Sequence, residues 1–451
     1  MRIHFIAIGG AAMHSLALAL QRKGFKITGS DDVIFDPSKS RLAEAGILPE
    51  TFGWFPENIT TAIDIVILGM HAKPDNPELL SAQELGLTIY SYPEFLYEHS
   101  KDKTRVVIGG SHGKTTITAM ILHVFRYHDL EVDYMIGARL AGFDAMVHLT
   151  DTNDFILLEG DEYWASTIDR RPKFHLYKPN IALLSGIAWD HINVFPTYEN
   201  YLEQFRIFVD TIEKGGSITY NEEDETVKSI VETSENTIRK MGYRTPEYII
   251  KDDKTLLHTP EGSMPIVVFG KHNLTNLAGA KWICQHMGID EADFYEAIAT
   301  FKGALGRMEK IAEGPSSVIY KDFAHAPSKV AATTKAMKEQ YHTKTLVACL
   351  ELHTYSSLNA EFLKEYKSTL DAADAAVVFY THEALKIKQL REITTKQITD
   401  AFQREDLIIH TRTEDFKDFL FSRSLSNTVL LLMSSGNYGG LDFDQLSSLI
   451  P

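Results

Sequence analysis

The chain has 451 residues, of which 44% are hydrophobic and 24% are charged. This balance is typical of a folded protein and excludes a disordered, collagen-like or disulfide-framework chain. Its 45 Lys and Arg against 61 Asp and Glu give a formal net charge of −16, which excludes a general affinity for polyanions such as nucleic acid. Any phosphate must therefore be bound locally. At about 100–200 residues per domain, the length favours about three domains.

The cysteines and the first residues of the chain predict the cellular compartment of the protein. Cys284 and Cys349 are the two cysteines of the chain, and we expect two reduced thiols rather than a disulfide framework or a metal pattern. The residues from Met1 to Phe5 read directly as a strand and carry no export signal. No apolar run approaches the roughly 20 residues that cross a bilayer. We expect a cytoplasmic protein without membrane insertion.

Strand and helix patterns alternate along the first hundred residues. Such alternation predicts a parallel sheet with helices on its faces. The expected strands are 3–8, 25–29, 63–68 and 87–90, and helices are expected after the glycine turn 9–12 and at 79–85.

Two breaks in this pattern predict the domain organisation. The polar residues 100–104 precede a new strand, and the small residues 303–306 suit a hinge. Further strands are expected at 105–108, 155–159, 181–185, 318–320, 346–350, 375–379 and 429–433, with edge hairpins in the charged stretch 220–262. We predict an α/β protein of three domains: a Rossmann-like N-terminal domain (1–104), a central phosphate-loop ATPase domain (105–303) and a Rossmann-like C-terminal α/β domain (304–451).

The clearest local signal lies between Val106 and Thr116, where a strand enters a glycine-rich turn and leaves as a helix. Backbone N–H groups of such a turn point at phosphate oxygens, and the helix N-terminus adds a favourable dipole. Lys114 would neutralise the outer phosphates, and Thr115 would place its hydroxyl on Mg²⁺. A strict phosphate loop has Gly where this chain has Ile108, so an ordinary turn stays the alternative. The candidate phosphate-binding residues are Gly110, Ser111, His112, Gly113, Lys114, Thr115 and Thr116.

Acidic and imidazole groups follow two later strands. The carboxyl end of a parallel strand lies beside the phosphate loop, so a carboxylate of the run from Glu159 to Glu162 is a candidate Mg²⁺ ligand. A solvated acidic turn is the alternative. His191 beside Asp190 is either a metal ligand or half of a simple loop pair.

Two further segments suggest contacts to nucleotides. The first glycine turn lacks the full three-glycine fingerprint but is built to receive a diphosphate, and an acidic residue after the second strand can meet a ribose. In the second segment, Asn273 either binds the edge of a base or caps its helix. Arg307, further along the chain, follows the predicted hinge and could move onto a phosphate. The candidates are Gly9, Gly10, Ala11, Ala12, Met13, Ser30 and Asp31 in the first segment, and His272, Asn273 and Asn276 in the second.

These pieces, in this order, resemble the Mur ligase family of peptidoglycan precursor synthesis along essentially the whole chain. Within the family, the resemblance is closest to the branch that recycles a cell-wall tripeptide. The stretches that carry it are 28–31 with 36–38, Glu162-Tyr163, 169–174, 190–195 and 434–440.

The resemblance implies a mechanism and a role for each candidate. The family uses ATP to phosphorylate a carboxylate, and an amine then attacks the acyl phosphate. Lys114, Glu159 and His191 would be the catalytic residues, and Mg²⁺ would be held by Thr115 and Glu159, with His191 on a second metal. His272, Asn273 and Asn276 match the adenine-side motif. Arg307, Asp322 and His325 match residues that approach the nucleotide, with Asp322 on the ribose. The first glycine turn would bind the UDP-sugar.

Several positions depart from the family pattern. Relatives usually carry Asn at Gly186 and often Glu at Ala188, and Lys321 replaces a common acidic residue. Arg206 falls about where other branches carry a carbamylated lysine, so we predict no carbamate. The segment 351–357 stands where relatives usually carry arginine, and it is expected to face the incoming amine.

The leading hypothesis is an ATP-dependent ligase joining UDP-N-acetylmuramate to the tripeptide L-alanyl-γ-D-glutamyl-meso-diaminopimelate. The alternative within the family uses L-alanine as the amine. A different class, a non-catalytic sensor of UDP-sugars, would need no metal-bound carboxylate opposite Lys114. The implied partners are small molecules, with ATP and Mg²⁺, and the sequence indicates no obligate protein partner.

Overall fold

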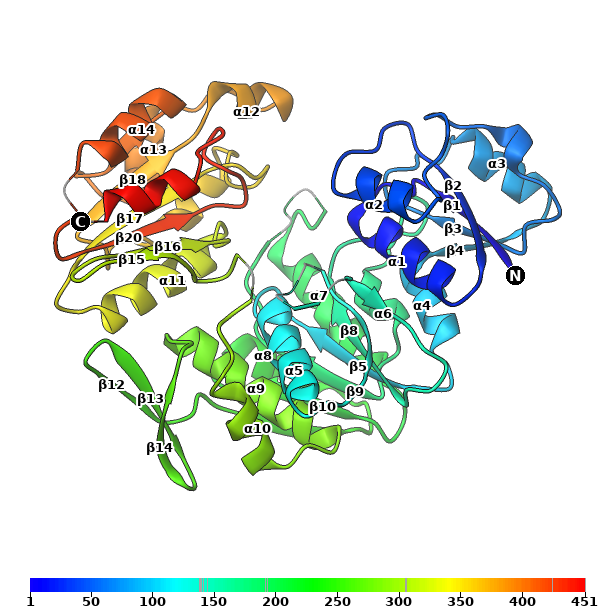
Figure 1. Ribbon diagram of the computed structural model, residues 1–451, viewed down its shortest axis with the longest axis horizontal. Coiled ribbons are helices and arrows are strands. Elements are labelled where there is room, and N and C mark those ends of the chain that lie inside the picture. Colours follow the sequence, from blue (N-terminus) through cyan, green and yellow to red (C-terminus); the bar gives the residue numbers. More distant parts are fainter. Residues whose placement is uncertain are drawn as a thin grey trace. The chain divides into compact units, whose positions relative to one another are not determined.

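The computed structural model describes residues 1–137, 140, 142–143, 145–190, 192, 194–304, 306–423 and 425–450 (Figure 1). They pack as two compact units. The first unit comprises 1–187, 199–243 and 279–290, and the second comprises 188–198, 244–278 and 291–451. Each unit is described by itself. The proposed domain boundaries near 104 and 303 stay a prediction, because these units follow packing rather than chain order.

The first unit contains a four-stranded parallel sheet near the N-terminus, in the order β2-β1-β3-β4. Helices follow the strands, as in other parallel α/β sheets, and Ile6, Leu68 and Leu79 contribute to a hydrophobic cluster beside it. The elements are β1 (Arg2–Ile6), α1 (Ala11–Arg22), β2 (Lys26–Ser30), α2 (Ser38–Glu44), β3 (Ile65–Leu68), α3 (Pro77–Glu84), β4 (Thr88–Ser91) and α4 (Tyr92–His99).

The second sheet of this unit has seven strands in the order β11-β10-β9-β5-β8-β6-β7, all parallel except the pair β6 and β7. Its central strands are almost wholly buried apolar runs, as expected when helices cover both faces. The elements are β5 (Thr104–Gly109), α5 (Lys114–Tyr127), β6 (Asp133–Met135), β7 (Val147–His148), β8 (Phe155–Gly160), α6 (Lys173–Leu176), β9 (Ile181–Leu184), α7 (Tyr198–Asp210), β10 (Ser217–Asn221), α8 (Glu225–Thr233) and β11 (Arg239–Tyr243).

The second unit contains an antiparallel sheet β12-β13-β14 and a six-stranded sheet β15-β16-β20-β17-β18-β19. Only β15 runs antiparallel in the larger sheet, and apolar clusters containing Leu350 and Leu432 pack on it. The strands are β12 (Tyr248–Lys251), β13 (Lys254–Thr259), β14 (Gly262–Ile266), β15 (Glu309–Glu313), β16 (Val318–Asp322), β17 (Thr345–Glu351), β18 (Ala375–Phe379), β19 (Ile408–His410) and β20 (Thr428–Met433). The helices are α11 (Pro327–Gln340), α12 (His382–Ile387), α13 (Thr395–Phe402) and α14 (Thr413–Phe421). Helix α10 (Glu291–Ile298) precedes β15, and α9 (Lys271–His286) belongs to this unit up to Ala278 and to the first unit from Gly279.

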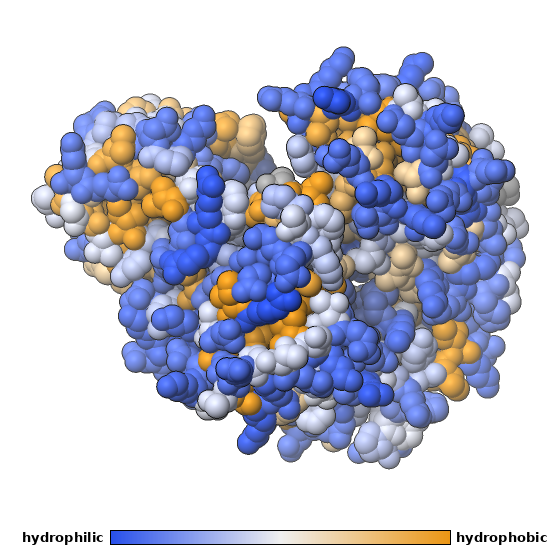
Figure 2. Space-filling view, turned by 180° about the vertical axis from the view of Figure 1, so that it is seen from behind, coloured by the Kyte–Doolittle hydropathy of each residue, from blue (hydrophilic) through white to orange (hydrophobic). Residues whose placement is uncertain are grey.

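The face drawn in Figure 2 is mainly hydrophilic, with separate hydrophobic patches. Among the described residues, no helix is both long enough and apolar enough to cross a membrane. The predicted α/β class is confirmed, and each strand expected from the sequence has a counterpart shifted by at most a few residues. The hairpins expected within 220–262 are present only in part. The antiparallel strands β12, β13 and β14 lie at and just beyond the C-terminal end of that stretch, but they form a sheet of their own rather than the edge of a larger one, and β10 and β11 pair in parallel.

Candidate functional site

The glycine turn after β5 has the backbone shape of a phosphate-binding loop. Gly110 has a φ of 134° and Gly113, the N-cap of α5, has a φ of 83°, values that a residue with a Cβ rarely adopts. A Cβ on Gly110 would overlap the Ser185 hydroxyl, which itself donates to the carbonyl of His112. The Ser111 N–H donates to Gly186 O at 2.9 Å. The loop is thus held against the end of β9, at the N-terminus of a 14-residue helix.

Lys114 lies at the centre of this loop. Its Nζ is 2.5 Å from Gly110 O and 2.5 Å from Glu162 Oε2, and its side chain is 12% exposed. Burial alone would lower the pKa of Lys114, but the carboxylates of Glu162 and Asp161 outweigh it and raise the pKa above the ordinary value. Lys114 is therefore a fixed positive charge at neutral pH.

Glu162 is held from its other side by a residue that the sequence did not indicate. The Tyr201 hydroxyl donates to Glu162 Oε1 at 3.0 Å, and both side chains are buried. Tyr201 lies on α7, 39 residues further along the chain, and no local pattern marks it. Next to this pair, Asp161 binds Lys173 at 2.5 Å.

Thr115 and Glu159 meet as predicted for a magnesium site. Thr115 Oγ1 donates to Glu159 Oε1 at 2.7 Å, and Gly137 N donates to Oε2 at 2.7 Å. A hydroxyl and a carboxylate are hard oxygen ligands of the kind that Mg²⁺ takes beside nucleotide phosphates, so these two residues fit that ion. Within the described residues no group of three His, Cys, Asp or Glu side chains forms a metal cluster. His191, the third predicted ligand, lies outside the described residues.

Gly186, one of the departures from the family pattern, lies against the imidazole of the phosphate loop. A Cβ at this position would overlap Nε2 of His112, whose Nδ1 lies 2.9 Å from the Ser111 hydroxyl. A side chain at this position would therefore require the outer end of the imidazole to turn aside.

Asn221 and Asp224 hold the residues that follow β9. Asn221 Nδ2 donates to Ser185 O at 3.1 Å, and Asp224 Oδ2 accepts from Ile187 N at 2.9 Å. Sequence reasoning missed both. The polar run after β10 was the available signal, because the carboxyl ends of parallel strands share one edge of the sheet.

The first glycine turn is closed by Asp31. Gly9 N donates to Asp31 Oδ2 at 2.7 Å, and burial raises the pKa of this carboxyl above its ordinary value although the Gly9 bond opposes it. Ser30 is buried and donates to Glu78, a fully buried carboxylate that also accepts from Phe55 N at 2.7 Å. Gly10, Ala11, Ala12 and Met13 form the entry to α1. Asp31 thus orders the turn, and Ser30 faces inward.

In the second unit, Asp322 organises the turn after β16. Its carboxylate accepts from Met308 N at 2.6 Å and from Ala324 N at 2.7 Å, and it is buried. Arg307 stacks its guanidinium 4.5 Å from the centre of the Phe323 ring. These bonds join the segment after the predicted hinge to the predicted nucleotide turn.

Two predicted histidines of this unit are neutral at neutral pH. Burial lowers the pKa of His325 to about 4, and the positive charge of Lys329 acts in the same direction. Burial also lowers the pKa of His272, although Asp322 opposes it. Asn273 donates to Phe269 O at 3.0 Å, and Asn276 is buried nearby on the first turns of α9. His272 and His325 can therefore act as hydrogen-bonding groups rather than as cations.

The segment expected to meet the amine begins with a buried carboxylate. Glu351, the last residue of β17, accepts from the Ser434 hydroxyl and from Tyr438 N, the latter at 2.8 Å. His353 Nδ1 lies 3.7 Å from Glu351, and the side chain of His353 is 43% exposed. The network joins residues of two segments quoted in the sequence analysis, 351–357 and 434–440.

Comparison with known families matches three consecutive family models. The Mur ligase family catalytic domain matches residues 2–104, the Mur ligase middle domain matches 108–284, and the Mur ligase glutamate ligase domain matches 306–436. Together they span most of the chain.

Individual relatives carry two different names. A UDP-N-acetylmuramate–L-alanine ligase of Sulfurihydrogenibium is 30% identical over 85% of this chain and 83% of its own length. A UDP-N-acetylmuramate–L-alanyl-γ-D-glutamyl-meso-2,6-diaminoheptandioate ligase of Haemophilus influenzae is 26% identical over 97% of each chain. The crystal structure of a murein peptide ligase of Psychrobacter arcticus shares the fold, with a TM-score of 0.65 and 21% identity over 100% of this chain and 98% of its own. Both names recur among further matches, and the alanine ligases are the more numerous.

Proposed function

Because the chain belongs to the Mur ligase family of ATP-dependent ligases of peptidoglycan synthesis, we propose that it joins UDP-N-acetylmuramate to the tripeptide L-alanyl-γ-D-glutamyl-meso-diaminopimelate. The observation that carries the ligase chemistry is that Lys114 meets Glu162 and Thr115 meets Glu159 where the glycine turn enters α5. Both substrates are small molecules.

The proposed reaction has two steps that balance without any redox partner. A carboxylate oxygen of the muramate attacks the γ-phosphorus of ATP, and ADP leaves. The peptide amine then attacks the acyl carbon and loses a proton, and phosphate leaves as the amide bond forms. Negative charge accumulates in both transition states, so a buried cation such as Lys114 stabilises them more than it stabilises the ground state.

Glu162 gives Lys114 its orientation in this scheme. The ammonium is held between Gly110 O and Glu162 Oε2, and Tyr201 fixes the other carboxylate oxygen. A charge held in place by neighbours costs little reorganisation when the phosphoryl group arrives. We propose Glu162 and Tyr201 as positioning residues of the phosphate loop.

Thr115 and Glu159 would hold Mg²⁺, and His191 is proposed for a second ion. A divalent cation bound there supplies charge neutralisation for the phosphate oxygens. Glu159 is already fixed by Gly137 N, so the carboxylate is oriented before any ion binds.

The remaining candidates keep the roles implied by the family resemblance. We propose that the turn from Gly9 to Met13, ordered by Asp31, binds the UDP-sugar. Nucleotide-side roles are proposed for His272, Asn273, Asn276, Arg307, Asp322 and His325.

L-Alanine is the second candidate amine, because the Sulfurihydrogenibium relative carries that name at 30% identity. The stretches at 169–174 and 434–440, which resemble the tripeptide branch, favour the larger amine. The two candidates share every step up to the acyl phosphate, so they differ only in the nucleophile.

The deciding experiment supplies purified protein with ATP, Mg²⁺, UDP-N-acetylmuramate and one amine at a time, and follows ADP release and the amide product. We expect turnover with the tripeptide and at least tenfold lower kcat/KM with L-alanine. Turnover with L-alanine and none with the tripeptide would overturn the amine assignment while leaving the ligase intact. Omission of UDP-N-acetylmuramate is the control for uncoupled ATP hydrolysis.

A further inference from the structure

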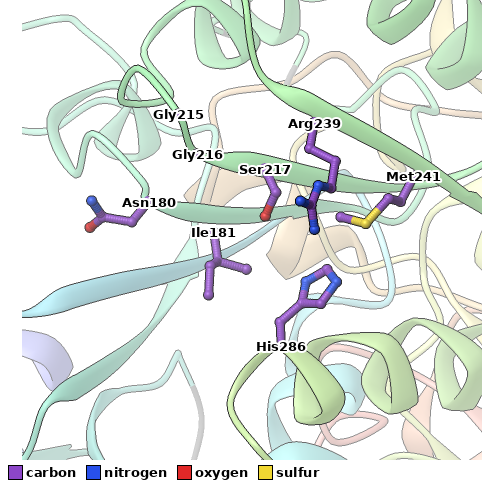
Figure 3. Close-up of a pocket in the computed structure, with 8 residues that line it drawn as sticks. All are labelled: Asn180, Ile181, Gly215, Gly216, Ser217, Arg239, Met241 and His286. Carbon is purple, nitrogen blue, oxygen red and sulfur yellow. The ribbon is translucent and has the colours of Figure 1, made fainter.

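A cavity of about 400 Å³ lies at the edge of the seven-stranded sheet where β9, β10 and β11 begin (Figure 3). Ile181, Ser217 and Arg239, the first residues of these strands, line it together with Met241 and with His286 at the end of α9. The phosphate loop follows the last residue of β5, which runs parallel to β9. The cavity therefore lies at the amino ends of the strands of this sheet, and the phosphate loop lies at their carboxyl ends.

The side chains of this cavity converge as hydrogen-bond donors. In Figure 3 the Arg239 guanidinium and the His286 ring point toward one another, with the Ser217 hydroxyl beside them and Met241 between strand and helix. The side chain of Asn180 points away. The described residues that line the cavity include no Asp or Glu, although the chain has a net charge of −16.

Two polar groups here have unused binding capacity. Nδ1 of His286 is buried and has no hydrogen-bond partner among the described residues, a condition that normally costs free energy unless a ligand or water satisfies the group. The Arg239 guanidinium makes no ion pair with any residue that the structure describes, and its charge acts on His286. An arginine without a carboxylate partner among the described residues, facing a half-buried imidazole with one unsatisfied nitrogen, is the arrangement that an anion would complete.

We propose that this cavity binds the phosphoryl group of a small phosphate-bearing molecule, at a site separate from the phosphate loop. A phosphoryl group presents three acceptor oxygens, and guanidinium forks bind two of them at once. The Ser217 hydroxyl and a His286 N–H reach the third from other directions. Ile181 and Met241 provide an apolar wall for an organic remainder, and the volume is in the range of small-molecule sites.

The proposal does not rest on the proposed function, and the experiment separates the two. Binding of inorganic phosphate and of glycerol phosphate is measured by calorimetry on the full chain carrying Lys114→Ala, which removes the charge of the phosphate loop. We expect one saturable site per chain in this background. Adding Arg239→Gln should weaken it about tenfold or more, as expected for the loss of a charge-assisted hydrogen bond.

Matched variants make the result specific. Lys214→Gln, an exposed cation next to the cavity in sequence, should leave the affinity within about twofold. Arg239→Lys should bind more weakly than the parent because it lacks the planar fork, and His286→Gln should also weaken binding. Arg239 is exposed, so its variants should fold, and an unchanged melting temperature verifies this.

The sources of the phosphoryl group are distinguished by the two probes. Tighter binding of glycerol phosphate indicates an ester as the ligand, and binding of inorganic phosphate alone indicates free phosphate. No saturable binding in the Lys114→Ala background, equal affinity after Arg239→Gln, or acetate competing as well as phosphate would overturn the proposal.

Discussion

Lys114 Nζ and Glu162 Oε2 lie 2.5 Å apart, although 48 residues separate them in the chain. One ends a glycine turn and the other follows a neighbouring parallel strand. The pair links the cation proposed to meet phosphate to the carboxylate proposed to orient it.

Lys114→Ala should abolish most of the ligase activity. Loss of a fixed charge at the reacting phosphate is expected to lower kcat about 10²–10³-fold, measured as UDP-N-acetylmuramate-dependent ADP release. Lys101→Ala removes an exposed lysine paired with Glu98 and serves as the control. Intact turnover in Lys114→Ala would contradict the catalytic assignment.

Glu159→Gln should weaken the response to Mg²⁺ rather than the fold. The amide keeps the bond from Gly137 N but removes the charge, so a higher Mg²⁺ concentration should be needed for half-maximal activity. Chelation by EDTA should stop turnover of the parent protein, and added Mg²⁺ should restore it. An unchanged Mg²⁺ dependence in the variant would argue against Glu159 as the ligand.

Gly186→Ala should displace the His112 imidazole, because its Cβ would overlap the outer end of that ring. Overpacking of a core costs about 1–3 kcal/mol, and we expect a loss at or below the lower end of that range because the ring can turn, read as a lower urea midpoint. The double variant with His112→Ala should recover most of the loss. Gly10→Ala, whose Cβ would meet its nearest atom at 3.6 Å, is the matched control. A loss that His112→Ala leaves unchanged would show that the imidazole is not the obstacle.

Stability should fall between pH 6.5 and pH 4. Burial lowers the pKa of His175 to about 4, and its Nε2 lies 2.7 Å from Gln204 O. As the pH falls, the His175 imidazole binds a proton near pH 6.5 in the unfolded chain but only near pH 4 in the folded chain. The stabilising contribution is therefore complete above pH 6.5 and is lost as the pH falls through this window.

His175→Gln should make the free energy of unfolding fall less steeply with pH, by at most about 1.4 kcal/mol per pH unit. The free energy is measured by urea unfolding at pH 7, 5.5 and 4.5. His325, with a pKa lowered to about 4, contributes in the same window and remains in the variant. His258→Gln changes an exposed histidine and should leave the slope as it is. An identical slope in His175→Gln would contradict the assignment.

His353→Ala should raise the KM for the amine and leave the KM for ATP within about twofold. The side chain is partly exposed beside the buried Glu351 network, and removal of one polar contact typically costs about tenfold or less in affinity. His382→Ala, which breaks an exposed pair with Glu392, is the control. An effect on the KM for ATP alone would contradict the placement of the amine at the segment 351–357.

The sequence by itself determined the local elements and the chemical groups that they carry. The α/β class, the glycine turn, the helix that begins at Lys114 and the carboxylates after β8 follow from patterns a few residues long, in which backbone preferences and side-chain periodicity act locally. Comparison along the whole chain then agreed with the family resemblance.

Only the tertiary structure decided which of these groups meet. The contacts of Tyr201 with Glu162 and of Asn221 with Ser185, and the close approach of His112 to Gly186, depend on the strand order β11-β10-β9-β5-β8-β6-β7. That order is set by non-local packing of apolar faces, which no short window of sequence contains. The cavity of Arg239 and His286 likewise depends on the tertiary structure, because its residues come from the amino ends of separate strands and from the end of a helix.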